Sequence, residues 1–342
     1  MSAILVFILS LCAATVLTAR VIRYAHRREL LDIPNARSSH ATPTPRGGGL
    51  AVVVVVLITA MALWLGGILG NGTGLALLGG GGLMALTGWI DDHRDLPALY
   101  RLLLQFLAAG WLLAWLPGHG VVEIAGYTLG LGGLVLPALV VIACVWLINL
   151  YNFMDGADGF AGLQCLSACL AVALMLVMDG YRGGALLPTA LAGACAGFMV
   201  WNWPPARIFM GDVGSYFVGY CLALLALLTN GVQFIDLSIW GILLSVFLWD
   251  ASLTLVMRIF AGQTWYKAHR SHAYQNLIQM GWTHRRLALG FAILQLGLLW
   301  PLAFYVHARP QAQGPVLLGI SLLMVLIWGT IQYRFRQGTA HP

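Results

Sequence analysis

Residues 149–162, NLYNFMDGADGFAG, place two amides and two carboxylates between two long apolar runs. Asn149 and Asn152 are three residues apart, as are Asp155 and Asp158, which puts each pair on one side of a helical turn. Oxygen-rich side chains beside flexible glycines suit a hard cation and a phosphate group. Asn, Asp and Gly are also common where a helix ends in a turn, so the segment alone fits a binding site or a turn.

Residues 32–49, DIPNARSSHATPTPRGGG, form a second polar segment that ends in three consecutive glycines. Prolines stiffen such a segment, and we expect the glycines to leave backbone N–H groups available for an anion. Arg37 and Arg46 could bind a phosphate in a forked geometry. The alternative is a positively charged loop that only anchors the chain at a membrane.

Residues 88–101, GWIDDHRDLPALYR, contain the adjacent carboxylates Asp91 and Asp92. One of two adjacent carboxylates should have its pKa raised by the other unless a cation relieves the repulsion. The pair therefore suits a general base or a magnesium partner, with Arg94 and Arg101 available to phosphate. A solvated loop that ends a helix is the alternative.

Residues 202–215, NWPPARIFMGDVGS, place Asp212 at the start of the next apolar run. Helix N-termini favour anions, so Asp212 could be a simple cap, or it could hold Mg²⁺ while backbone N–H groups hold phosphate. Phe209, three residues earlier, could stack on a base. These residues alone leave the cap and the ligand open.

Residues 258–285 carry several cations beside His269, Arg270 and His272, which together could bind a diphosphate. No third strong ligand or cysteine lies nearby in sequence, which argues against zinc. Asp250 lies inside the preceding apolar run, where an ionisable group needs a partner. We expect that partner to be Arg258 or a cation on another helix.

The composition requires a membrane to accommodate these segments. Of the 342 residues, 60% are hydrophobic and only 9% are charged, which excludes a soluble domain. No compact basic domain exists to bind nucleic acid, although the net charge is +6. The six cysteines all lie in apolar runs and are expected to be free thiols.

The sequence predicts an all-α polytopic membrane protein, a single domain over residues 1–342 with about eleven spans. The expected spans are residues 3–21, 50–69, 73–90, 99–116, 134–151, 161–178, 185–201, 213–229, 237–257, 286–305 and 315–333. With the N-terminus outside, 16 of the 18 Lys and Arg residues fall on the inner side, and only Arg182 and Arg309 fall outside. The positive-inside rule therefore predicts a periplasmic N-terminus and a cytoplasmic C-terminus.

Eight of the twelve acidic residues fall on the same inner side. A transporter or flippase for lipid-linked sugars, the alternative function, would place polar groups near the bilayer midplane, where only Asp250 lies. We expect one site built from the cytoplasmic loops 22–49, 91–98, 152–160, 202–212 and 258–285.

Five segments together resemble the polytopic prenyl-phosphate N-acetylhexosamine-1-phosphate transferases, the MraY and WecA family. They are PNARSSHATPTPRGGGLA, the pair Asp91–Asp92, NLYNFMDGADG, PARIFMGDVGS and HRSHAYQ, in the family's order over nearly the whole chain. The resemblance implies transfer of sugar-1-phosphate from a UDP-N-acetylhexosamine to undecaprenyl phosphate, with release of UMP. It also implies a Mg²⁺ cofactor and a multi-pass bacterial inner-membrane enzyme whose site faces the cytoplasm.

The resemblance assigns roles to individual residues. Asp212 and Asn152 match the family's magnesium site, and Asp91, with Asp92 beside it, matches the carboxylate that deprotonates or orients the lipid phosphate. Asp158 and Phe209 match positions that hold uracil, and Asp155 and Asn149 are expected beside them. Arg46, Arg94, Arg101, His269, Arg270 and His272 are expected to contact phosphates or sugar.

The fifth segment departs from the pattern. It reads His269-Arg-Ser-His272, whereas MraY has consecutive histidines there and WecA a His-x-His-His run. This argues against a muramoyl-pentapeptide substrate. It resembles the WbpL type, which starts O-antigen synthesis from UDP-GlcNAc or a 6-deoxy amino sugar such as UDP-FucNAc. The oligomeric state stays open, a homodimer being one possible assembly.

Overall fold

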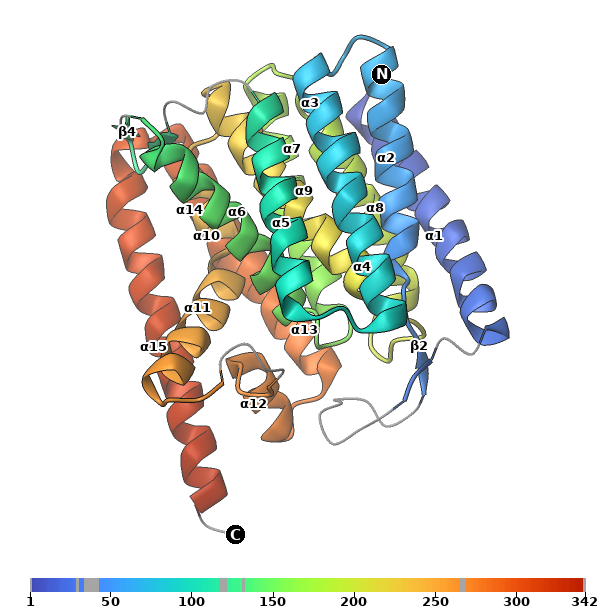
Figure 1. Cartoon of the computed structure of the whole chain (residues 1–342). Helices are drawn as coiled ribbons and strands as arrows, with labels where there is room; N and C mark the ends of the chain where they lie inside the picture. The colour runs from blue at the N-terminus through green and yellow to red at the C-terminus, as the bar shows by residue number, and fades with distance from the viewer. Residues whose placement is uncertain are drawn as a thin grey trace.

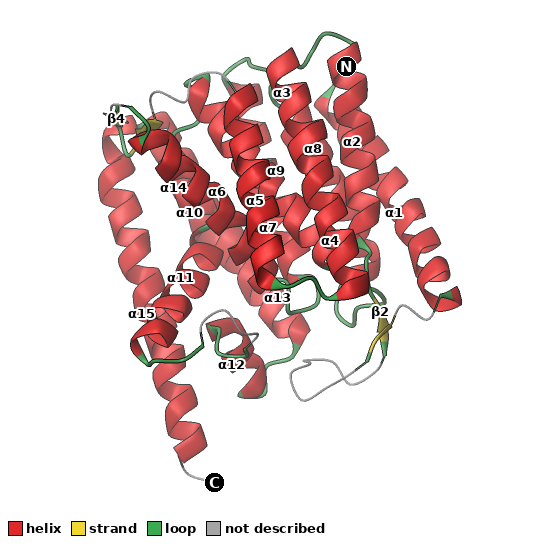
Figure 2. Cartoon of the chain, in the orientation of Figure 1, coloured by secondary structure: helices red, strands yellow, loops and turns green. Residues whose placement is uncertain are grey.

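A computed structural model describes residues 2–28, 31–33, 43–116, 122–130, 133–264 and 269–340. The chain forms a bundle of long apolar helices, which confirms the predicted all-α polytopic membrane protein (Figures 1 and 2). Two short antiparallel hairpins accompany the helices: β1 (Leu31–Asp32) with β2 (Thr44–Pro45), and β3 (Val122–Ile124) with β4 (Tyr127–Leu129).

The helices follow one another with short connections. They are α1 (Ala3–Arg27), α2 (Gly49–Leu65), α3 (Asn71–Leu75), the π-helix η1 (Ala76–Gly81), α4 (Gly82–Arg94), α5 (Ala98–Trp115), α6 (Val135–Phe153), α7 (Phe160–Met178), α8 (Leu186–Asn202), α9 (Asp212–Gly231), α10 (Leu237–Leu243), α11 (Ser245–Phe260), α12 (Ala273–Gln279), α13 (His284–Leu294), the π-helix η2 (Gln295–Leu299), α14 (Trp300–Ala308), the 3₁₀ turn η3 (Pro310–Ala312) and α15 (Gln313–Ala340).

Among the described residues, eight helices are long and apolar enough to cross a bilayer, with a ninth if the bent pair α10–α11 is one span. Helices α2 and α8 are also apolar but have 17 residues each, slightly fewer than the ~20 that a span usually needs. The number of spans and the sidedness of the termini therefore remain predictions. The two termini do lie at opposite ends of the bundle (Figure 1).

Helices α7, α8 and α9 form the interior. In the most apolar stretches of α7 and α9, 72% and 83% of residues are buried, compared with 22% for α1 and 11% for α15. Gly193 and Gly197 of α8 lie four residues apart and face α1, where an added Cβ would overlap the backbone carbonyls of Phe7 and Leu11. Small residues at this spacing let two helices approach closely where no hydrophobic driving force acts between them.

The span α10–α11 bends by 79°. The carbonyl oxygen of Leu243 at the bend accepts hydrogen bonds from the side-chain amides of Gln164 (3.1 Å) and Gln295 (3.0 Å), both fully buried. In an apolar interior, a backbone group at a helix break needs such a partner. The bend turns α11 away from the bundle and toward α15 (Figure 1).

The described parts of the connections that the sequence singled out lie at the end of the bundle opposite the start of α1, together with α12 (Figure 1). At this end Gly88 of α4 packs on the first residues of α9, and an added Cβ would overlap the backbone of Asp212 and Val213. The glycine therefore allows the ends of α4 and α9 to meet.

We expect Gly88→Ala to lower the unfolding temperature of the detergent-purified protein, because overpacking a tight contact costs about 1–3 kcal/mol. Gly82→Ala in the same helix is the matched control, since no heavy atom lies within 4 Å of its Cβ position. It should leave the unfolding temperature unchanged or slightly raised. Equal unfolding temperatures for the two variants would contradict the close contact of α4 with α9.

Candidate active site

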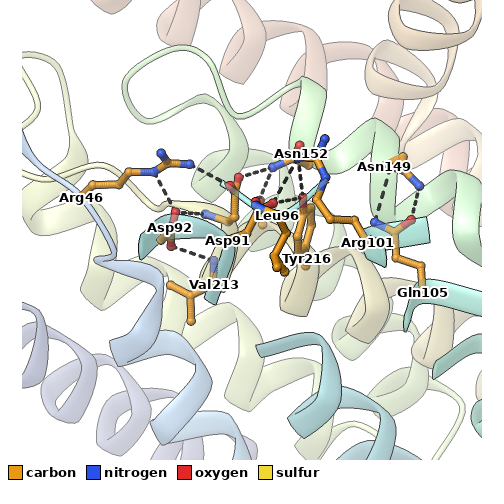
Figure 3. A network of polar contacts seen from close by, with 12 residues as sticks. Arg46, Asp91, Asp92, Leu96, Arg101, Gln105, Asn149, Asn152, Val213 and Tyr216 are labelled. Atoms are coloured by element: carbon orange, nitrogen blue, oxygen red, sulfur yellow. Dashed lines mark hydrogen bonds and ion pairs between the residues drawn. The ribbon is translucent and has the colours of Figure 1, made fainter. Parts of the chain in front are cut away.

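Arg46 joins two carboxylates that come from different helices. Its Nε lies 2.7 Å from Asp92 Oδ1 at the end of α4, and its Nη2 lies 2.8 Å from Asp212 Oδ2 at the start of α9 (Figure 3). Burial lowers the pKa of Arg46, but the charges of Asp212 and Asp92 outweigh this and leave the pKa raised. The guanidinium is therefore a permanent positive charge between two acids.

Asp92 caps α9. Its carboxylate accepts hydrogen bonds from the backbone N–H groups of Asp212 (2.8 Å) and Val213 (3.0 Å), and its side chain is only 5% exposed. A carboxylate at a helix N-terminus satisfies free N–H groups and interacts favourably with the helix dipole. Because Asp92 fills this role, the Asp212 side chain is not the cap and is directed to Arg46 and Asn152.

Asp91 binds a different set of partners. It is 3% exposed and accepts hydrogen bonds from the Leu96 N–H (2.8 Å), the Tyr216 hydroxyl (2.8 Å) and Arg101 Nη1 (3.1 Å). Each of the two adjacent carboxylates thus has its own arginine, which relieves their repulsion. Arg101, expected to be available to phosphate, is already paired with Asp91, whereas Arg94 is exposed.

Asn149 and Asn152, which the sequence places on one side of α6, contact different partners. Asn152 donates its amide to Asp212 Oδ1 (2.7 Å) and to Ser215 Oγ (2.9 Å), which places it at the centre of the site. Asn149 instead exchanges hydrogen bonds with Gln105 in α5, with its Nδ2 2.6 Å from Gln105 Oε1. Figure 3 shows the Asn149–Gln105 pair to one side of the carboxylates, so the structure does not bring Asn149 to the position expected of it.

The described part of the chain holds no preformed group of three or more acidic, His or Cys residues around a metal position. Mg²⁺ usually keeps several waters and uses only one or two carboxylates together with substrate phosphates. Asp155 accepts no hydrogen bond in this part of the chain, and burial followed by the charge of Asp212 raises its pKa well above the usual value. Asp212 and Asp155 therefore fit a hard cation, which would relieve their repulsion. Asn152 could join them only after rotation of its amide, because its nitrogen now faces Asp212.

A second group of contacts surrounds Asp158. Its carboxylate accepts a hydrogen bond from the Ala206 N–H (3.0 Å) and lies 3.0 Å from His284 Nδ1 at the start of α13. Asn202 ties the same two connections together, since it accepts from the Gly159 N–H (2.9 Å) and donates to the Ile208 carbonyl (2.8 Å). Sequence reasoning missed His284 and Asn202, because each acts through a partner more than forty residues away.

The connection between α1 and α2 pairs through its backbone with the connection between α8 and α9. Phe209 donates its backbone N–H to Pro45 (2.9 Å) and accepts from Gly48 (2.8 Å), and Gly49 donates to Met210 (2.8 Å). The expectation that the glycines leave their N–H groups available for an anion is therefore wrong for Gly48 and Gly49. Their function is close approach, because an added Cβ on Gly49 would overlap the backbone of α9. Half-buried Phe209 lies beside Arg46 through this pairing.

Asp250 of α11 fixes the position of α12, which lies in the connection between α11 and α13. Its carboxylate accepts from the backbone N–H groups of Ala273 (2.8 Å) and Tyr274 (3.1 Å) at the start of α12. Of the two expected kinds of partner, Arg258 is wrong, since it binds the Thr264 carbonyl (3.0 Å), whereas His272 at the start of α12 places its Nδ1 3.6 Å from Asp250 Oδ1. The sequence did not predict that Asp250 would bind the N-terminus of α12, because local spacing does not show which helix end lies nearby. The Tyr274 hydroxyl donates to the Phe153 carbonyl (3.0 Å) and joins α12 to the end of α6.

His269 and His272 stack on each other with ring centroids 4.8 Å apart. Burial, then the nearby His272, lowers the pKa of His269 to about 4, so it is neutral at pH 7. His272 also stacks with Phe153 and Tyr274, and its Nδ1 faces the Asp250 carboxylate. Arg270, between the two histidines in sequence, keeps its positive charge at pH 7. Arg37 and Lys267 lie outside the described residues.

Comparison with known proteins matches the same part of the chain. The family model described as Glycosyl transferase family 4 matches residues 74–230, which include Asp91, Asp92, Asn152 and Asp212. The chain is 33% identical to a decaprenyl-phosphate N-acetylglucosaminephosphotransferase of Mycobacterium leprae, over 90% of this chain and 87% of that protein.

Two other relatives are named for different activities. A probable undecaprenyl-phosphate N-acetylglucosaminyl 1-phosphate transferase of Bacillus subtilis is 28% identical over 95% of this chain and 89% of its own. A phospho-N-acetylmuramoyl-pentapeptide-transferase of a Synechococcus species is 33% identical over only 60% of this chain and 61% of its own. The two relatives named for N-acetylglucosamine phosphate transfer thus match over more of the chain than the one named for muramoyl-pentapeptide transfer.

We expect Arg46→Ala to destabilise the protein by about 3 kcal/mol at pH 8, because it leaves two partly buried carboxylates without their cation. Without the guanidinium these carboxylates bind protons more readily in the folded state. The loss in unfolding temperature relative to wild type should therefore shrink as the pH falls from about 8 to about 5. Arg94→Ala, at an exposed arginine on α4, is the control and should have little effect. A deficit that does not change with pH would contradict the pairing.

Proposed function

The chain belongs to glycosyl transferase family 4, and on this basis we propose that it transfers N-acetylhexosamine-1-phosphate from a UDP-sugar to a polyprenyl phosphate. An oxygen of the lipid phosphate forms a bond to the sugar-bearing phosphorus of the donor. The bond from that phosphorus to the bridging oxygen breaks, and UMP leaves with the electron pair. The product is a lipid diphosphate sugar.

The observation that carries this proposal is the alternation of cations and carboxylates around Arg46 at one end of the bundle. Both substrates are anionic, so their approach is opposed by charge. Such a reaction needs positioning and electrostatic stabilisation more than covalent chemistry from the protein. The acceptor phosphate lies at headgroup depth, which is where the ends of membrane-spanning helices lie.

We assign the charged residues two roles: contact with the phosphates and binding of Mg²⁺. Arg46, and the exposed Arg94, would contact phosphates, while Asp212 and Asp155 would hold Mg²⁺. When bound, Mg²⁺ would supply positive charge to the donor diphosphate. Asp91 would act by fixing Arg101 rather than by taking a proton, because its oxygens are buried and already accept three hydrogen bonds.

Asp158 and Phe209 would hold the uracil, and two observations support this. The connection between α8 and α9 contacts the Asp158 carboxylate through Ala206 and carries Phe209 three residues later. A carboxylate can accept a hydrogen bond from a base N–H, and an aromatic ring can stack on the base. Arg270 would contact the sugar or its phosphate.

The finer identity of the substrates is also a proposal. We propose UDP-GlcNAc or a UDP-FucNAc-type donor and undecaprenyl phosphate, in the first membrane step of O-antigen or another surface polysaccharide. The names of the relatives that match over most of the chain support an N-acetylglucosamine donor. The positive-inside distribution supports a site that faces the cytoplasm, where nucleotide sugars are made.

Purified protein should release UMP when offered UDP-GlcNAc or UDP-FucNAc together with undecaprenyl phosphate, and mass spectrometry should detect the lipid diphosphate sugar. EDTA should stop the reaction and Mg²⁺ should restore it, because the metal would supply positive charge that offsets the negative charge of the donor diphosphate. No product with any UDP-N-acetylhexosamine would contradict the proposed function. Full turnover in EDTA would contradict the metal site alone.

We expect Asp212→Asn and Asp91→Asn each to reduce UMP release by at least ~100-fold, because the first removes a carboxylate that would hold Mg²⁺ and the second releases Arg101, whose positive charge would offset that of the phosphates. Asp95→Asn is the matched control, since Asp95 ends the same helix as Asp91 but is exposed. It should keep near-normal turnover. Unfolding temperatures close to wild type would show that the inactive variants are folded, and near-normal turnover of either one would remove its assigned role.

A further inference from the structure

A shallow cavity of ≈ 410 Å³, open to the surface, lies beside the first turns of α13, apart from the site described above. Its lining combines a polar end with an apolar wall: Trp282, Thr283, Arg285 and Arg286 at the start of α13, and Leu289, Gly290 and Ile293 farther along it. The proposed reaction uses none of these residues.

The polar end carries two adjacent positive charges. The Arg286 guanidinium lies 4.3 Å from the centroid of the Trp282 ring, a cation–π contact that fixes its position. Both Arg285 and Arg286 are exposed, and within the described ranges neither is paired with a carboxylate. They differ in this from Arg46 and Arg101, which are both bound to acids.

The order of residues along α13 matches the depth profile of a membrane leaflet. His284, its first residue, contacts Asp158, so Arg285 and Arg286 lie at the level of the polar end of the bundle. Leu289 and Ile293 follow one and two turns deeper and are 45% and 72% exposed. From Arg285 to Ile293 the helix rises about 12 Å, the distance from a phosphate into the acyl region. Trp282 has the position of an interfacial anchor.

We propose that this cavity binds one anionic phospholipid of the surrounding bilayer. The phosphate lies between the guanidinium groups of Arg285 and Arg286, and the first methylenes of an acyl chain lie along Leu289 and Ile293. The choice of occupant rests on charge and shape together. Two unpaired guanidiniums select an anion, and the apolar wall beneath them selects an anion that carries a hydrocarbon chain.

The bound lipid would steady the start of α13. His284 immediately precedes the two arginines and is the partner of Asp158. A phospholipid on Arg285 and Arg286 would therefore restrict the element that holds this carboxylate. The lipid does not enter the site itself, so its binding can be measured without assuming any activity.

Native mass spectrometry of the whole purified protein, mixed with phosphatidylglycerol or phosphatidylcholine, tests the proposal. Wild type should retain one phosphatidylglycerol under activation that removes phosphatidylcholine. The double variant Arg285→Gln/Arg286→Gln should bind phosphatidylglycerol roughly ten-fold more weakly or worse. Gly290→Leu keeps both charges but fills the cavity, and it should also lose the lipid. At Gly290 an added Cβ meets only Trp282, at an ordinary 3.7 Å, so this variant should fold.

The matched control is Arg20→Gln/Arg27→Gln, which removes the same charge from two exposed positions at the inner end of α1. It should retain the lipid. Equal losses in the two double variants would mean general attraction by basic residues and would overturn the proposal. Retention in Gly290→Leu, or displacement of the lipid by equimolar undecaprenyl phosphate, would overturn it as well.

Discussion

The bridge from Arg46 to Asp92 and Asp212 is the interaction on which the rest of the site depends. It joins the connection after α1, the end of α4 and the start of α9, three parts of the chain that are far apart in sequence. Two ionised carboxylates this close would repel, and the cation between them stabilises the contact of α4 with α9. The guanidinium has the forked geometry to bind both at once, which a lysine ammonium lacks.

The helices make this bridge possible through close approach. Gly88 lets α4 meet α9, and Gly49 lets the start of α2 lie against Gly214 of α9. On the other side of the site, the bend between α10 and α11 brings Asp250 to the N-terminus of α12. The site is therefore built from helix ends, and its side chains owe their positions to packing between spans.

The sequence was sufficient for the broad architecture. Long apolar runs required membrane-spanning helices, and the uneven distribution of Lys and Arg placed the polar connections at one end, where the structure has them. It also directed attention to Asp92, Asn152 and Asp212, which the structure brings together near Arg46, while their roles in a reaction remain predictions.

The partners of these residues could not be predicted. Asp158 binds His284, which is 126 positions away, and local spacing carries no information about such a contact. Asn149 faced α5 instead of the carboxylates, because the rotation of α6 is set by packing. Of the three consecutive glycines at positions 47–49, Gly48 and Gly49 donate their N–H groups to backbone carbonyls, although the flexibility of glycine had indicated an anion site.

The central claim is that the site's connections meet the cytosol at a single membrane surface. Labelling single cysteines with a membrane-impermeant reagent in oriented vesicles tests it most directly, after exposed Cys12 is replaced by serine. Cysteines at Arg94 and Arg207, both exposed at the polar end, should react only from the cytoplasmic side, and one at exposed Arg182 only from the periplasmic side. Reaction of the first two from the periplasm, or from opposite sides, would contradict the account.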